Sequence, residues 1–335
     1  MKVVRGRIAE IRTQAPQQGK RVNLTGAYLA PGFIDLHIWG DPHIVSSDAA
    51  RTGTTAFLSA TGPASAASLL KYLAFINAQR GLEGARCLGA HLEGPFLNPV
   101  RAGALSARGM RRPTATELRA MARTGCVKLM TIAPELPGAA EAIRWCRAHG
   151  IAASLGHSDA DAATAVRAIE AGASAVTHVF NGMRPLHHRV PSLLDVALTD
   201  PRLTTMVILD GVHISPSAFR LLVRAKGPDR VALVTDSIRH QGWDVVSRRG
   251  AYYTRRGTLA GSRLTMIKAV QHAVEYGDVP LADAVRMAAQ VPATLLGLQQ
   301  EYGALAVGKR ADLVAFDRQF RVRMTMVSGT VVHSH

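Results

Sequence analysis

The chain has 335 residues, 47% of them hydrophobic, which is enough to bury a sizeable core in one large domain or two. It contains no run of 18 uncharged apolar residues, which predicts that no segment spans a membrane, and its three widely spaced cysteines without a CxxC pair favour a reduced, cytoplasmic protein. The net charge of +16 would suit a nucleic-acid binder, but the basic residues are mostly scattered and no nucleic-acid motif accompanies them, so the sequence does not favour that class.

From residue 33 onward, short apolar runs alternate with helix-like segments rich in alanine and leucine. The apolar runs cover residues 33–37, 54–59, 86–91, 128–132, 151–155, 175–179, 204–209 and 230–235. The helix-like segments include 64–79, 117–124, 139–149, 160–171 and 216–226. Strands without polar alternation are buried on both faces, as in a parallel sheet covered by helices. Eight such units predict an α/β fold, a (β/α)8 barrel more than an open sheet.

The two ends of the chain do not follow this pattern. Residues 1–30 and 306–335 contain short strand-like runs separated by turns, and we expect them to pair into one small β-sandwich beside the barrel. This predicts two domains, a sandwich formed by 1–30 plus 306–335 and a catalytic barrel formed by 31–305. Two helices, over about 264–275 and 281–298, would complete the barrel domain.

One dense basic segment follows the eighth apolar run. It spans residues 239–256 and contains Arg239, Arg248, Arg249, Arg255 and Arg256. At the end of a barrel strand it would attract an anionic substrate by electrostatic steering. A solvated, arginine-rich surface is an equally good interpretation of the same segment.

Residues able to hold a metal ion or a proton stand at the ends of four apolar runs. They are Glu93, His157, His178 and Asp236. The carboxyl ends of the strands form the active face of a (β/α)8 barrel, so these side chains are expected to converge there. Burying an ionised glutamate is costly unless it is paired or coordinates a metal, and two histidines with one glutamate form a common catalytic zinc set. The pattern therefore predicts one divalent metal ion, preferably zinc, held by Glu93, His157 and His178.

Asp236 has two interpretations. As a general base it would take a proton from the attacking water and return it to the leaving group. As an N-cap it would only begin the next helix. The convergence of the metal set on the same face of the barrel favours the general base.

Several motifs make the chain similar to a known group of enzymes. They are PGFIDLH at 31–37, HLEGPFLNP at 91–99, GHS at 156–158, THVFNGM at 177–183, DGVH at 210–213, VTD at 234–236 and GKRADLV at 308–314. On these motifs the chain resembles the amidohydrolase superfamily, and within it the N-acetylglucosamine-6-phosphate deacetylases, over nearly its whole length. The resemblance implies hydrolysis of the acetamide of N-acetylglucosamine 6-phosphate by a homodimer in which neighbouring subunits complete the site.

The resemblance also assigns roles to single residues. It assigns Glu93, His157 and His178 to the metal, Asp236 to acid–base catalysis, and Asn181, Gly182, Arg189 and His213 to the substrate. The first three of the substrate positions match those that bind the sugar phosphate. A planar arginine fork and backbone N–H groups are physically suited to a phosphate dianion.

Two positions depart from the family pattern. The strand-one motif His-x-His reads His37-Ile38-Trp39 here, and an indole cannot ligate a metal, which argues against a second metal ion. Leu105 stands where the family has a histidine that polarises the acetamide carbonyl, and leucine has no donor to aim at a developing oxyanion. Candidate replacements are His187, His188 and His240 for the polarising histidine and His43 for the second strand-one histidine.

These departures keep two alternatives open. The chain could be a diverged amidohydrolase acting on another N-acyl or cyclic amide, an interpretation that Leu105 and Trp243 support. It could also be a weakly catalytic paralogue that binds a sugar phosphate, which the intact set of Glu93, two histidines and Asp236 opposes.

Overall fold

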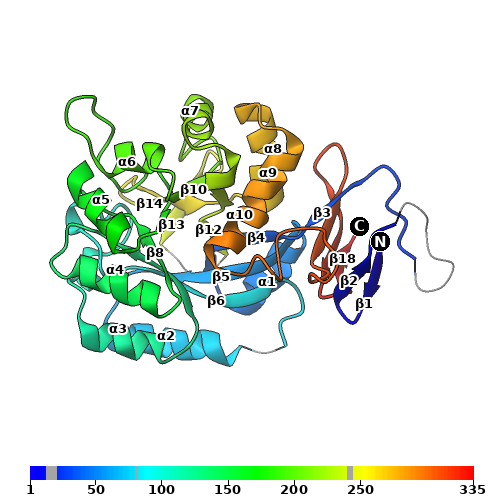
Figure 1. Cartoon of the computed structure of the whole chain (residues 1–335), viewed down its shortest axis with the longest axis horizontal. Helices are drawn as coiled ribbons and strands as arrows, with labels where there is room; N and C mark the ends of the chain where they lie inside the picture. The colour runs from blue at the N-terminus through cyan, green and yellow to red at the C-terminus, as the bar shows by residue number, and fades with distance from the viewer. Residues whose placement is uncertain (13–20, 80, 240–243) are drawn as a thin grey trace.

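A computed structural model, which describes residues 1–12, 21–79, 81–239 and 244–335, shows a ring of parallel strands surrounded by helices, with a small β-structure at one end (Figure 1). The strands of the ring are β4 (Phe33–Gly40), β5 (Thr54–Thr61), β6 (Arg86–Glu93), β7 (Val127–Ile132), β8 (Ala152–Leu155), β9 (Ala175–Val176), β10 (Thr204–Ile208) and β11 (Val231–Val234). Each pairs in parallel with the next. The Asp236 N–H donates to the His37 carbonyl at 2.8 Å, so the last strand meets the first. The predicted (β/α)8 barrel is confirmed.

Helices connect successive strands and complete the barrel. They are α1 (Pro42–Ala50), α2 (Ala66–Ala78), α3 (Ala115–Ala122), α4 (Ala139–Ala148), α5 (Ala162–Ala171), α6 (Leu193–Thr199), α7 (Pro216–Lys226), α8 (Met266–Gly277), α9 (Leu281–Ala288) and α10 (Gln290–Leu295). Side-chain caps set several starting points; the Asp161 carboxylate, for example, accepts from the Thr164 N–H at the beginning of α5.

Two elements differ from their predicted length. The single helix expected over 281–298 is two helices, because Pro292 lacks an N–H and its ring would clash with the carbonyl of residue 288 in a continuous helix. The strand expected over 175–179 ends at Val176, since His178 and Phe180 adopt positive φ angles of 28° and 77° that no strand contains. Where the strands continue, as in β10 and β11, every residue is buried, as the uninterrupted apolar runs predicted.

The two chain ends pair beside the barrel, as predicted. β1 (Lys2–Val4) and β2 (Arg7–Glu10) form one antiparallel pair, and β3 (Tyr28–Pro31), β16 (Leu313–Phe316), β17 (Val322–Val327) and β18 (Thr330–Ser334) form a four-stranded antiparallel sheet. Ile8, Ala311 and Leu313 form a small buried cluster between them. The N- and C-termini consequently lie close together (Figure 1). The division of the chain into two domains at residues 30 and 306 stays a prediction.

A β-hairpin extends the barrel sheet after the eighth strand, and the sequence did not predict it. β12 (Ser237–Arg239) pairs in parallel with β4 and β15 (Leu259–Ser262), and β13 (Val245–Arg248) and β14 (Ala251–Thr254) complete an antiparallel extension. Most of the predicted basic segment falls here, and Arg248, Arg249, Arg255 and Arg256 are exposed. Within the described part of the chain, no helix has the length and apolar character required to cross a bilayer.

Candidate active site

A cavity of about 430 Å³ opens at the carboxyl ends of the barrel strands. Nine positions were expected in the site, namely the metal, acid–base and substrate positions and Leu105. The cavity lining includes eight of them, all but Arg189: Glu93, Leu105, His157, His178, Asn181, Gly182, His213 and Asp236. Trp39 and residues of the hairpin, from Val245 to Gly261, close another part of the wall. The barrel therefore collects side chains from six separate segments of sequence into one pocket, where chemistry on a small molecule is expected.

Glu93 and two histidines form the centre of this pocket. The Oε1 atom of Glu93 lies 2.8 Å from Nε2 of His157 and 2.8 Å from Nε2 of His178, and all three side chains are almost fully buried. The Nδ1 atom of His157 lies 2.8 Å from the Arg101 carbonyl, to which it donates, so its Nε2 lone pair is available for a cation. Two imidazole nitrogens and a carboxylate oxygen converging in this way match the ligand chemistry of zinc.

His37 joins this centre, although the sequence interpretation gave it no role. Its Nε2 atom lies 3.5 Å from Oε2 of Glu93 and 3.1 Å from Oδ1 of Asp236. Ligand atoms of His37, Glu93 and His178 all lie within 4.8 Å of one another, which makes these residues a buried candidate metal site. His37 ends the first apolar run of the sequence, 33–37, and this could have revealed it, because the other metal candidates also stand near the ends of such runs. In the structure β4 continues past His37 to Gly40.

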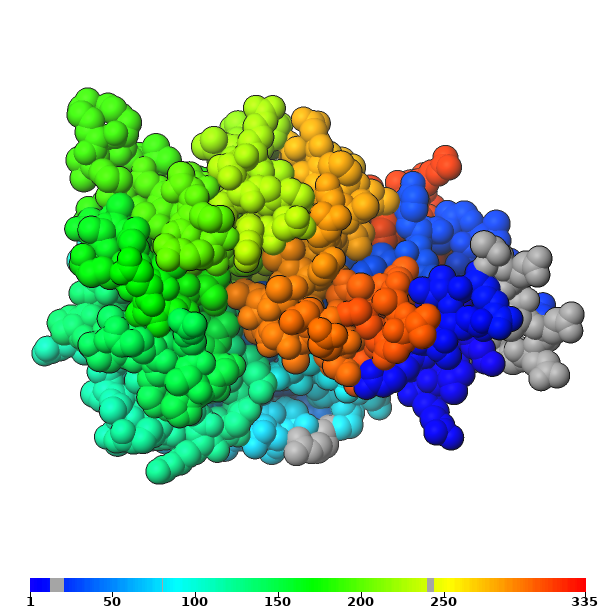
Figure 2. Space-filling model, in the orientation of Figure 1, coloured from blue at the N-terminus to red at the C-terminus, as the bar shows by residue number. Residues whose placement is uncertain are grey.

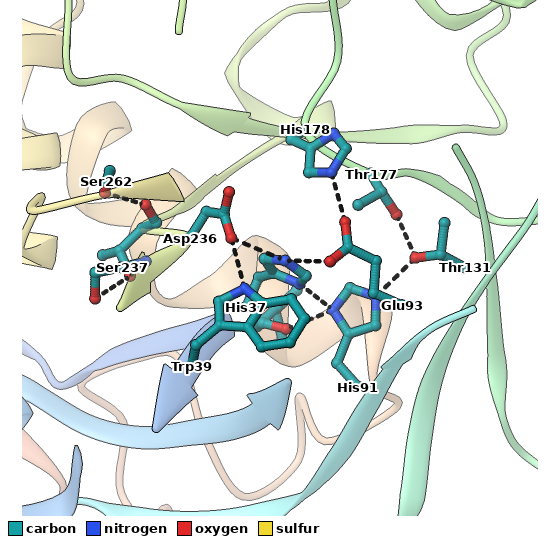
Figure 3. A network of polar contacts seen from close by, with 12 residues as sticks. His37, Trp39, His91, Glu93, Thr131, Thr177, His178, Asp236, Ser237 and Ser262 are labelled. Atoms are coloured by element: carbon teal, nitrogen blue, oxygen red, sulfur yellow. Dashed lines mark hydrogen bonds and ion pairs between the residues drawn. The ribbon is translucent and has the colours of Figure 1, made fainter. Parts of the chain in front are cut away.

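A buried chain of polar side chains orients His37 (Figure 3). Its Nδ1 atom lies 2.6 Å from Nδ1 of His91, whose Nε2 atom lies 2.8 Å from Oγ1 of Thr131, and that hydroxyl lies 2.8 Å from the hydroxyl of Thr177. Burial and the nearby charge of His37 hold the pKa of His91 well below its usual value, so His91 is neutral. The Nδ1 atom of His91 also lies 3.0 Å from the Leu36 carbonyl. Because His37 contacts His91 through Nδ1, its Nε2 atom faces the carboxylates of Glu93 and Asp236 and is left to bind a cation.

The electrostatics of the centre require positive charge. Burial would lower the pKa of His37, but the carboxylates of Glu93 and Asp236 outweigh burial and raise that pKa to about 10. Burial would raise the pKa of Glu93, yet the charge of His37 and hydrogen bonds from His157 and His178 hold it well below its usual value. The pKa of His157 is raised because its hydrogen bond and attraction to Glu93 exceed the cost of burial. A divalent cation would supply the same charge to these carboxylates.

Three site residues have left-handed backbone conformations. The φ angles are 45° at His157, 28° at His178 and 48° at Asp236, each just after a barrel strand. Such conformations cost a non-glycine residue about 1–3 kcal/mol and persist where the surrounding structure imposes them. Gly182, itself at a φ of 61°, packs so closely that a Cβ there would lie 2.9 Å from Nδ1 of His157.

Of the four substrate candidates, Asn181, Gly182 and His213 line the cavity and Arg189 does not. The side-chain amide of Asn181 donates to the His178 and Val179 carbonyls, and Nδ1 of His213 lies 2.7 Å from Oδ2 of Asp210. Arg189 is exposed and lies outside the cavity lining, with one guanidinium nitrogen 2.8 Å from Nε2 of His188. It belongs to the loop between β9 and α6, which projects from the barrel at the upper left (Figures 1 and 2). The described residues that line the cavity include no lysine or arginine.

The candidate replacements for the missing polarising histidine do not reach the cavity where they are described. His43, His187 and His188 are absent from its lining, while His240 and Trp243 lie outside the described residues. Leu105 lines the cavity at the expected place, packed against the buried cluster of Trp39, Ala60 and Ile238. This wall of the pocket is therefore apolar.

Comparisons with known proteins agree with this geometry. Residues 28–332 match the amidohydrolase family. N-acetylglucosamine-6-phosphate deacetylase from Vibrio furnissii is 36% identical over 91% of this chain and 82% of its own, and N-acetylgalactosamine-6-phosphate deacetylase from Escherichia coli O157:H7 is 33% identical over 90% and 86%. The structure of a Mycobacterium smegmatis N-acetyl-D-glucosamine-6-phosphate deacetylase mutant in complex with N-acetyl-D-glucosamine-6-phosphate superposes with a TM-score of 0.90, at 32% identity, over 99% of this chain and 94% of that one.

Proposed function

The chain belongs to the amidohydrolase family, and from this we propose that it is a metal-dependent deacetylase that hydrolyses N-acetylglucosamine 6-phosphate to glucosamine 6-phosphate and acetate. The observation that carries the proposal is the convergence of Glu93, His157, His178 and Asp236 in one cavity. Relatives named for this reaction cover nearly the whole chain, which supports the substrate as well as the reaction class.

Different residues would bind the metal ion, transfer the proton and contact the sugar. Glu93, His157 and His178 would hold the metal ion, with His37 beside them, and zinc suits this set of nitrogen and carboxylate ligands. When bound, the ion polarises the acetamide carbonyl and makes water more acidic. Asp236 accepts the proton of the attacking water and returns it to the amine nitrogen as the C–N bond breaks. Asn181 and His213, which also line the cavity, would contact the sugar.

We further propose that the active form is a homodimer in a reducing compartment such as the cytoplasm. A phosphate dianion needs cationic or N–H donors, and the described cavity lining of one chain offers no lysine or arginine. Arginine from the projecting loop of Arg189, in the same chain or its partner, would supply this charge. Cys87, Cys126 and Cys146 are free, and burial raises the pKa of each thiol, which suits a protein kept reduced.

Leu105 favours a second candidate, the same hydrolysis on another N-acyl or cyclic amide. The apolar wall that it forms with Trp39 offers no hydrogen bond to an acetamide oxygen. A panel assay separates the two candidates, with acetate or amine release measured on phosphorylated and free N-acetyl amino sugars, including the galactosamine isomer. Fastest turnover of N-acetylglucosamine 6-phosphate supports the first candidate. Turnover only of other amides supports the second, and binding without turnover would identify a weakly catalytic paralogue.

Arg189→Ala is expected to raise the KM for N-acetylglucosamine 6-phosphate and to leave kcat nearly unchanged. The reason is that a guanidinium that binds the phosphate contributes equally to the ground state and the transition state, so its loss weakens binding alone. Initial-rate kinetics measure both constants. Arg144→Ala, at an exposed position on α4, is the matched control and should change neither. Equal processing of free N-acetylglucosamine and its 6-phosphate by the wild type would show that no phosphate site operates.

Leu105→His is expected to raise kcat/KM on N-acetylglucosamine 6-phosphate, because it restores a donor to the apolar wall. A single oxyanion donor is typically worth about 10²–10³-fold in rate, which sets the upper limit of the gain. Leu105→Met, which keeps an apolar side chain, is the control, and a thermal melt checks that each variant is folded. A folded histidine variant without a gain, beside a fast wild type, would mean that another group already polarises the carbonyl.

A further inference from the structure

Trp39 makes a direct polar contact with the proposed general base. Its indole N–H donates to Oδ1 of Asp236 at 2.8 Å (Figure 3). The two residues are 197 positions apart in the sequence and meet because β12, which follows Asp236, pairs in parallel with β4, which contains Trp39. The contact thus forms only because the barrel closes. Trp39 stands where the family has the second strand-one histidine.

The indole is held firmly in this position. Trp39 is 7% exposed and packs against Ala60, Leu105 and Ile238, and its ring meets that of His37 edge-on at 5.8 Å. Its register partner on the neighbouring strand is Ile238. A tryptophan fixed on several sides loses little further freedom when it donates a hydrogen bond, so the N–H can hold its acceptor in one orientation.

The two oxygens of Asp236 are consequently unlike each other. Oδ1 takes the Trp39 N–H and lies 3.1 Å from Nε2 of His37, whereas none of the described residues donates to Oδ2. Asp236 lines the cavity, and its side chain is 13% exposed. One oxygen is therefore tied to the protein, and the other is available to a molecule in the cavity.

We propose that Trp39 is a positioning residue that fixes the Asp236 carboxylate through Oδ1, so that Oδ2 carries the proton between water and the leaving amine. The proposal rests on the deacetylase function proposed above and adds a residue to it. In place of the second strand-one imidazole, the indole supplies a hydrogen bond and offers no metal ligand. The same ring thus orients the base and limits the centre to one ion.

The kinetic test compares Trp39→Phe with Trp145→Phe in the metal-loaded enzyme. Phenylalanine keeps an aromatic ring and removes the N–H, so we expect kcat on N-acetylglucosamine 6-phosphate to fall about 10–100-fold, because small misplacements of a catalytic group cost up to about 10²-fold. KM and the metal content should stay within twofold of the wild type. Trp145 stacks on His149 outside the site and should not affect kcat when replaced. An unchanged kcat in folded, metal-loaded Trp39→Phe would overturn the proposal.

A spectroscopic test keeps the contact falsifiable even if Trp39→Phe fails to fold or the enzyme acts on another substrate. In ¹H–¹⁵N spectra of protein labelled at the tryptophan indole nitrogens, Asp236→Ala should shift one indole signal markedly and leave that of Trp145 in place. Trp145→Phe and Trp243→Phe identify the other signals by their loss. If the Trp39 signal does not move, the hydrogen bond is absent and the proposal is wrong. A shifted signal with no deacetylation of any substrate would instead refute the proposed function alone.

Discussion

Asp236→Asn is expected to reduce turnover by about 10²–10⁴-fold, the range typical of general acid–base catalysis, with the metal content unchanged. Asparagine keeps the shape of the side chain and an oxygen that can accept the Trp39 N–H, but it cannot take a proton from water. Asparagine also tolerates the left-handed backbone at this position, where φ is 48°, so the fold should be preserved. Steady-state kinetics and elemental analysis of the same preparation measure the two quantities.

The matched control for this variant is Asp229→Asn. Asp229 is exposed on the 3₁₀ turn before β11 and pairs with Arg286, away from the cavity, so turnover should not change. Near-normal turnover in Asp236→Asn would require another base. Glu135 does not suit this role, because its carboxylate accepts hydrogen bonds from Asn98, Ser158 and the Asp159 N–H and does not line the cavity. Its structural task is to hold the turn that follows His157.

Removal of the metal ion is expected to reduce turnover by about 10³-fold or more. The reason is that the ion contributes several kcal/mol to stabilising transition-state charge. Protein purified without chelator should contain one divalent ion per chain, and His157→Ala/His178→Ala should contain almost none. Elemental analysis measures the content, and turnover should return when zinc is added to chelated wild type. Two ions per chain, or full content in the double variant, would contradict the ligand assignment.

The affinity for the metal should rise with pH across the neutral range. Without the ion, the carboxylates raise the pKa of His37 to about 10 and that of His157 above its usual value, so protons occupy the imidazoles at neutral pH. A cation must displace these protons, and its binding weakens as the pH falls. Competition with a chromophoric chelator at several pH values measures the affinity. An affinity independent of pH would mean that the ion is held elsewhere.

The barrel could be predicted because uninterrupted apolar runs report burial on both faces, and eight of them in alternation with helices leave few alternatives. The convergence of these site residues followed from the same regularity, since Glu93 ends a strand and His157, His178 and Asp236 each follow one. The hairpin β13–β15 could not be recognised, because its strands are only four residues long and lack regular apolar alternation, and Arg248 ends β13. The break at Ala289 was predictable in principle from Pro292, which no continuous helix accommodates easily.

The roles of His37, His91 and Trp39 depend on contacts that no local pattern contains. His91 and Glu93 are alternate residues of β6 and therefore point to the same face, which was a usable signal for a polar partner beside the metal set. That His91 meets His37, and that Trp39 meets Asp236, depends on the pairing of β4 with both β5 and β12 around a closed ring. A motif that lacks one histidine of the family pattern can thus contain a different polar group at that position.

Because of the left-handed backbones at His157, His178 and Asp236, selection for thermal stability conflicts with selection for activity at these positions. At each of these positions glycine would relieve strain of about 1–3 kcal/mol, and each substitution would delete a proposed ligand or the proposed base. A library screened only for survival at high temperature is therefore drawn toward inactive sequences at these three positions. Directed evolution of a more robust catalyst has to hold them constant and search the exposed helices and the terminal sheets instead.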